Sequence, residues 1–123
     1  MNVFTKCYNT KEERIEMLVD LNSLASYCHK IAHRRAMNES DCSIDSLELL
    51  KHCAGEVIEA TEAFANKDKK PAEFAGELCD VITCCMILLD KHCFDVTNCL
   101  YNTISKNAKR AGYDGMKGIS DRI

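Results

Sequence analysis

The sequence predicts an all-α protein, and two observations favour this fold class. One proline and five glycines in 123 residues permit long uninterrupted helices but supply few of the tight turns that a sheet requires. Apolar residues also recur with helical spacing along four segments, which short polar stretches separate. No internal repeat or change of composition marks a second unit, and a chain of this size can bury one core without metal or disulfide support. We therefore expect residues 1–123 to form a single helical domain.

The first predicted helix begins at Thr10 and ends near Arg35. Thr10 and Glu13 have the spacing of a capping box, in which both side chains accept hydrogen bonds from free backbone N–H groups. The apolar stripe of this helix comprises Ile15, Leu18, Leu21, Leu24, Ala25, Cys28, Ile31 and Ala32. The basic run 33–35 lies at the negative end of the helix dipole, and we interpret it as a solvated helix end.

Three further helices follow, and two of them form a predicted hairpin. The second covers 45–66, and we expect its inner stripe to be Leu47, Leu50, Ala54, Val57, Ile58 and Thr61. The third covers 71–93, where Pro71 suits the first turn because its missing N–H costs nothing there. The polar turn between these two helices is short, so they should form the central antiparallel hairpin of a four-helix bundle-like fold. A fourth helix should start at the N-cap Asp95 and end at Gly112, and the tail 115–123 should be mobile or ordered only by a partner.

Charge and hydropathy exclude two classes of partner. The net charge of −3 and the pI near 5.8 give no broad basic surface, so we expect no binding to nucleic acid. No segment has the apolar run of a signal peptide or of a membrane span, so we expect a cytoplasmic protein without membrane contact.

Nine cysteines are many for a chain of this length. Their odd number and the lack of a secretory signal predict reduced thiols. Most of them occupy positions where a small apolar residue would suit a helical core, namely Cys28, Cys53, Cys79, Cys84, Cys85 and Cys99. Three cysteines neighbour a histidine, but adjacent side chains on a helix point about 100° apart and the sequence has no CxxC motif. We therefore expect no structural zinc site.

Acidic residues on the predicted hairpin form the most informative pattern. Asp80 interrupts an apolar segment in which an ionised carboxylate is disfavoured unless a cation or hydrogen bonds compensate it, and Glu77 lies on the same face three residues earlier. If the turn is centred on Asp68, then Glu59 faces Glu77 and Glu56 faces Asp80. Four converging carboxylates suit a hard cation, Mg²⁺ or Mn²⁺, better than zinc. The alternative is that Glu56 and Glu59 are ordinary solvent-facing acids.

These residues resemble a known family. Glu56-Val57-Ile58-Glu59 and Glu77-Leu78-Cys79-Asp80 are similar to the ExxE and ExxD signature of the MazG-like, all-α nucleoside triphosphate pyrophosphohydrolases. The resemblance covers the second to fourth predicted helices. It implies a Mg²⁺-dependent enzyme that hydrolyses a nucleoside triphosphate to the monophosphate and pyrophosphate, with Glu56, Glu59, Glu77 and Asp80 as metal ligands. We expect Glu56 also to orient or deprotonate the attacking water.

The last predicted helix adds a basic element to this resemblance. Lys106, Asn107, Lys109 and Arg110 are similar to the family's asparagine followed by basic residues, which implies binding of the substrate phosphates. Lys106 and Arg110 also share one helix face, so two cations there could hold a triphosphate. The alternative is a basic helix end that the dipole stabilises.

Both the apolar pattern and the resemblance predict a homo-oligomer. Residues 78–89 are apolar on nearly every side, which is more than one hairpin can cover, and the resemblance implies a site completed between subunits. We expect a homodimer or homotetramer. The alternative function, from another class, is a non-enzymatic helical oligomerisation or regulatory module.

Overall fold

The computed structural model describes residues 20–38, 44–93 and 95–115, and this part of the chain is helical without strands. Its elements are α2 (Leu21–Asn38), α3 (Ser46–Phe64), α4 (Pro71–His92) and α5 (Val96–Arg110). The predicted all-α class is therefore confirmed. Within the described ranges, no helix combines the length and hydropathy needed to cross a membrane.

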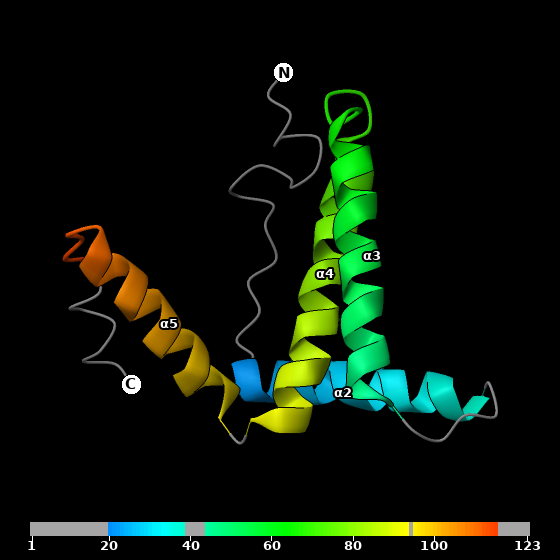
Figure 1. The fold of residues 1–123 in the computed structure, drawn as a ribbon, viewed down its shortest axis with the longest axis horizontal. Coiled ribbons are helices and arrows are strands. Elements are labelled where there is room, and N and C mark those ends of the chain that lie inside the picture. The colour runs from blue at the N-terminus through cyan, green and yellow to red at the C-terminus, as the bar shows by residue number, and fades with distance from the viewer. Residues whose placement is uncertain (1–19, 39–43, 94, 116–123) are drawn as a thin grey trace.

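Helices α3 and α4 form the predicted antiparallel hairpin (Figure 1). Asp45 caps α3, since its side chain accepts a hydrogen bond from the Glu48 backbone N–H, and Pro71 occupies the first turn of α4. At the tip of the hairpin, the rings of Phe64 and Phe74 meet edge to face with 5.6 Å between their centroids. These local signals explain why both helices lie close to the predicted ranges.

Helix α2 crosses the foot of the hairpin, far from the turn that joins α3 and α4 (Figure 1). The core at this crossing consists of Ala25, Met86 and Val96, with Leu21, Leu24, Cys28, Leu89 and Leu100 packed around it. His29 Nδ1 lies 2.8 Å from Asp90 Oδ2, so a polar contact also joins α2 to α4. Within the described residues, α2 thus packs against the hairpin at the end far from its turn.

Helix α5 packs against α2 and diverges from the hairpin (Figure 1). The Asn22 side chain sets its start, because Oδ1 accepts from the Val96 backbone N–H at 2.6 Å and Nδ2 donates to Asp95 Oδ1 at 3.2 Å. The predicted cap Asp95 is confirmed, and Gly112 follows the helix with a φ of 66°. In the described part of one chain the four helices therefore surround no common axis.

The first helix was predicted to continue through Asp20, and this prediction is wrong. This residue lies outside the helix, and its carboxylate accepts hydrogen bonds from the Ser23 N–H at 2.7 Å and the Ser23 hydroxyl at 2.8 Å. Helix α2 therefore begins at Leu21 with an aspartate at its N-terminus. The predicted cap at Thr10 and most of the tail 115–123 lie outside the described residues.

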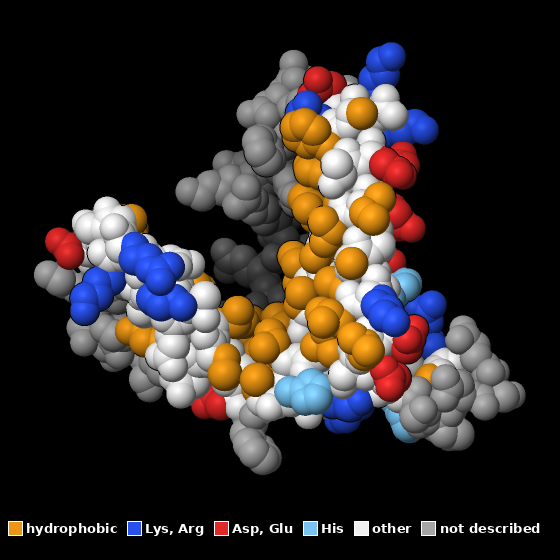
Figure 2. Space-filling view, viewed as in Figure 1, with side chains coloured by type: hydrophobic (Ala, Val, Ile, Leu, Met, Phe, Trp, Pro, Cys, Tyr) orange, Lys and Arg blue, Asp and Glu red, His pale blue; other side chains and the backbone are white. Residues whose placement is uncertain are grey.

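The predicted inner stripe of the second helix is also wrong. Leu47, Leu50 and Ile58 are 60%, 56% and 59% exposed, whereas the buried residues of α3 are Cys53 and Ala60. Small side chains face α4 and let the two helices approach closely, which leaves the larger ones outside. Figure 2 shows apolar side chains in a band along the hairpin. On α4, Leu78 and Ile82 are likewise exposed, so this helix is not buried on all sides in one chain.

Candidate metal centre

Three of the four predicted carboxylates converge between α3 and α4. One carboxylate oxygen each of Glu56, Glu59 and Glu77 lies within 4.8 Å of the other two. Spacings of three residues on α3 and an antiparallel partner helix produce this arrangement, as the sequence predicts. Asp80, one turn further along α4, lies outside this group of three. Its charge nevertheless raises the pKa of both Glu56 and Glu77, so it belongs to the same electrostatic site.

The acidic side chain that is buried differs from the one that we predicted. Asp80 is exposed, so the expectation of a buried aspartate in an apolar segment is wrong; the apolar residues around it in sequence point outward as well. Glu56 is the covered carboxylate, with a side chain only 13% exposed. Its Oε1 lies 3.0 Å from His52 Nε2. The free-energy cost of burying an ionised carboxylate, which we expected at Asp80, therefore arises at Glu56.

Two carboxylate oxygens in this cluster are buried without a hydrogen-bond partner among the described residues. They are Oε2 of Glu56 and Oε2 of Glu77. A buried carboxylate oxygen without a donor is costly, and a proton or a cation can compensate it. The two orphaned oxygens belong to the same group of three, so a single ligand could satisfy both.

Burial and mutual repulsion also shift the pKa values of the carboxylates in the cluster. Burial raises the pKa of Glu56 above its ordinary value, the charges of Glu59 and Asp80 raise it further, and His52 opposes the shift. Burial also raises the pKa of Glu77, and the charges of Glu59 and Asp80 raise it further. Glu59 is thus the group that both neighbours share. The pair Glu56 and Glu77 holds protons more tightly than free glutamates do.

The donor set fits a hard divalent cation. Each cluster residue offers carboxylate oxygen, which Mg²⁺ and Mn²⁺ accept readily, and no described cysteine or histidine belongs to the group of three. Glycines precede two of the cluster glutamates, since Gly55 lies before Glu56 and Gly76 before Glu77. A Cβ atom built at either glycine would meet nothing within 4 Å. The helix surface beside these carboxylates is therefore open.

A cavity of about 620 Å³ adjoins the cluster between α2 and the foot of the hairpin. Glu56 and Asp80 contribute its acidic edge, and Ile44, Leu49 and Ile87 contribute apolar surface. Its other lining residues are Ala32, Arg35, Ala36, Asp45, Glu48, His52, Thr83 and Cys84. The site thus combines an acidic edge with a cavity of the size that holds small molecules.

Sequence reasoning missed the part that Arg35 plays in this cavity. Residues 33–35 are exposed near the end of α2, as interpreted, and Arg35 also lines the cavity to which Glu56 and Asp80 contribute. The available signal was spacing, because Arg35 shares a helix face with the small residue Ala32. A small residue there leaves room beside the guanidinium.

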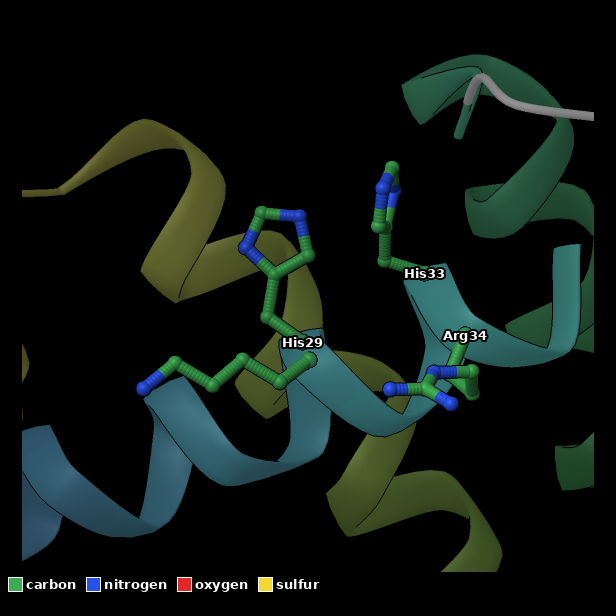
Figure 3. Close-up of a pocket in the computed structure, with 4 residues that line it drawn as sticks. His29, His33 and Arg34 are labelled. Carbon is green, nitrogen blue, oxygen red and sulfur yellow. The ribbon is translucent and has the colours of Figure 1, made fainter. Parts of the chain in front are cut away.

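A different face of α2 forms a second hollow, of about 530 Å³, lined by His29, Lys30, His33 and Arg34. Figure 3 shows these side chains projecting from one helix. No carboxylate of the metal cluster lines it. It is therefore separate from the candidate centre.

The predicted phosphate-binding residues lie on α5 and are not brought to the carboxylates within one chain. Lys106, Asn107, Lys109 and Arg110 are all exposed. Figure 2 shows the Lys and Arg side chains of α5 on an arm that diverges from the hairpin. Any joint action of the basic and acidic groups therefore requires a second copy of the chain or a movement of α5.

The comparisons with known proteins add no relative to this picture. The chain matches no protein-family model, no curated protein and no solved structure.

Proposed function

We propose that this protein is a Mg²⁺-dependent hydrolase that converts a nucleoside triphosphate to the monophosphate and pyrophosphate. The observation that carries the proposal is the convergence of Glu56, Glu59 and Glu77, in which two buried oxygens have no described partner. The similarity of the ExxE and ExxD motifs to MazG-like enzymes supplies the reaction class. The cavity beside Glu56 and Asp80 supplies room for a substrate.

Each residue then has a chemical task. Glu56, Glu59, Glu77 and Asp80 would hold the metal, which neutralises phosphate charge and acidifies a bound water. Glu56 suits the role of base, because its side chain lies at the edge of the cavity and one of its oxygens has no described hydrogen-bond partner. It accepts the proton of the attacking water while the water oxygen bonds to phosphorus. The phosphorus–oxygen bond to the departing pyrophosphate breaks in the same displacement.

Cationic groups would balance the charge of the substrate. Arg35 lines the cavity beside the carboxylates and can reach phosphate or base from α2. We assign Lys106, Asn107, Lys109 and Arg110 to the phosphates of a substrate held by a second copy, since α5 diverges from its own hairpin. This assignment belongs to a homodimer or homotetramer with a MazG-type arrangement. The exposed Leu47, Leu50 and Ile58 support such an assembly, because large apolar patches on a helix surface favour a partner.

The test is release of pyrophosphate from a panel of canonical and modified NTPs and dNTPs with Mg²⁺. Asp80→Asn should abolish release, whereas Asp68→Asn, an exposed aspartate in the turn between the same helices, should retain it. Full activity of Asp80→Asn would contradict the assignment of the acidic site.

The alternative function is a non-enzymatic helical oligomerisation module, and the exposed apolar residues of α3 favour it independently of the carboxylates. The same assay separates the two functions. A chain that forms oligomers but releases no pyrophosphate from any member of the panel would support the module and reject the enzyme.

A further inference from the structure

Two cysteine thiols meet between α3 and α4, next to the acidic cluster but outside it. Cys53 Sγ and Cys85 Sγ are 3.9 Å apart and share a hydrogen bond. Cys53 is buried, whereas Cys85 is exposed. The pair therefore joins an accessible sulfur to a protected one, in adjacent helices that belong to distant parts of the sequence.

We propose that Cys53 and Cys85 are a reversible oxidation site, which a hydroperoxide converts to a disulfide that links α3 to α4. A disulfide bond is about 2.05 Å long, so the two sulfurs must approach by about 1.9 Å. Rotation of the Cys85 side chain at the surface can supply part of this movement, because exposed side chains change rotamer readily. The thiols need no large rearrangement of the helices.

The reaction balances in two steps. Cys85 is oxidised first, because it is exposed: its thiol and one hydrogen peroxide give a sulfenic acid and one water, and the O–O bond breaks. The Cys53 sulfur then attacks the Cys85 sulfur, forms the S–S bond and releases the sulfenic oxygen as a second water. Two thiols lose two electrons and two hydrogens in total, and the peroxide accepts them. A thiol reductant reverses the link.

The surrounding thiols explain why this pair is singled out. Burial raises the pKa of Cys84 to about 11, so little of this thiol is the reactive thiolate near neutral pH, and the sulfur within hydrogen-bond distance of Cys53 is that of Cys85. Cys79 is exposed on the same helix and provides a matched control for accessibility. Burial and the hydrogen bond with Cys53 also raise the pKa of Cys85. Oxidation should therefore be slow near neutral pH and faster as the pH rises.

The link would constrain the hairpin close to the metal centre. Cys53 precedes Glu56 by three residues on α3, so the disulfide would lie about one helical turn from that carboxylate. Closing a loop across the hairpin should stabilise the fold and raise Tm by several degrees. The proposal is independent of the hydrolase assignment, because it depends only on the two sulfurs.

The experiment treats the folded full-length protein with hydrogen peroxide, blocks the remaining thiols and maps the tryptic peptides by mass spectrometry. Peptide 52–67 contains a single cysteine, Cys53, whereas the peptide that carries Cys85 also carries Cys79 and Cys84, so fragment ions and serine variants identify the partner. We expect a crosslink to the peptide that carries Cys85, with a loss of ~2 Da that a thiol reductant restores. Cys79→Ser and Cys84→Ser should retain the crosslink, whereas Cys85→Ser should abolish it.

Three results would overturn the proposal: absence of the crosslink in oxidised wild-type protein, its retention in Cys85→Ser, or its loss in Cys84→Ser with retained helical circular dichroism. Fragment ions that separate Cys84 from Cys85 in the wild-type crosslink decide the question even if one variant fails to fold. A urea-unfolded sample treated in the same way should lose the preference for this pair. Equal crosslinking of Cys53 to all partners in folded and unfolded protein would show that the native contact has no role.

Discussion

Replacing Glu59 with Gln tests whether the three carboxylates act as one metal-binding unit. Glu59 is the shared neighbour, because its charge raises the pKa of both Glu56 and Glu77. The variant should therefore relieve repulsion in the metal-free protein and remove a ligand from the metal-bound one. Metal-free Tm should rise, while the response to Mg²⁺ should shrink.

The expected size follows from binding to the folded state alone. At a hundredfold excess over Kd, a cation stabilises the fold by about 2.7 kcal/mol. Loss of an outer partner of a ligand already costs ~10–100-fold in metal affinity, so loss of Glu59 itself should cost about 100-fold. At the same Mg²⁺ concentration the stabilisation then falls to about 0.4 kcal/mol. For a domain of this size the Tm shift would drop from about 10 °C to about 2 °C.

Glu62→Gln is the matched control, because Glu62 is an exposed glutamate on the same helix and does not belong to the cluster. Scanning calorimetry with and without Mg²⁺ measures both effects. The reasoning is refuted if the two variants respond to Mg²⁺ alike, if wild-type Tm is unchanged by the metal, or if Glu59→Gln lowers metal-free Tm.

Three further predictions concern pH, the core and assembly. Metal-free Tm should rise as the pH falls toward 4.5, because the folded state binds protons at Glu56 and Glu77, whose pKa values lie above that ordinary value. Tm should fall again below about pH 3.8, where the unfolded chain takes up a proton that folded Asp95, with its lowered pKa, resists. A flat Tm from about pH 7 down to pH 4.5 would contradict the repulsion. Val96→Ala should lower the free energy of unfolding in urea by about 2 kcal/mol, because removing part of a side chain that is 1% exposed leaves a cavity. A much smaller loss would show that the surrounding residues close the cavity. Ile58→Glu should shift sedimentation toward the monomer if that exposed side chain lies between copies, and a monomeric wild type would reject the assembly.

Local signals made the helix ends predictable. Asp45, Pro71, Asp95 and Gly112 act on the backbone within a few residues, and the helices begin or end beside each of them as expected. The meeting of α3 and α4 carboxylates was predictable for a similar reason. A short turn fixes an antiparallel neighbour, and helical spacing then decides which side chains share a level.

The buried face of each helix and the direction of α5 were not predictable in the same way. The stripe on α3 was assigned by placing the largest apolar residues inward, but Cys53 and Ala60 face α4, and Leu47 and Ile58 face outward. Hydrophobic periodicity indicates which residues prefer burial and leaves open whether the same chain or another surface covers them. For this reason the prediction that Asp80 is buried was wrong. The direction of α5 depends on contacts with distant residues, namely the hydrogen bonds of Asn22 and the packing of Val96 and Leu100 against α2, which no local pattern encodes.

The open surface at Gly55 and Gly76 has a consequence for motion. Glycine inside a helix is less favourable than alanine by about 1 kcal/mol, and no tight contact requires it at either position. Each residue directly precedes a cluster glutamate, so the hairpin's helical backbone is weakest beside the groups that most need exact placement. A deficit of this size corresponds to about fivefold more frequent local opening, which amide hydrogen exchange resolves. The helical backbone directly before Glu56 and Glu77 is therefore less stable than the rest of each helix. It can adjust at these two positions when a ligand binds.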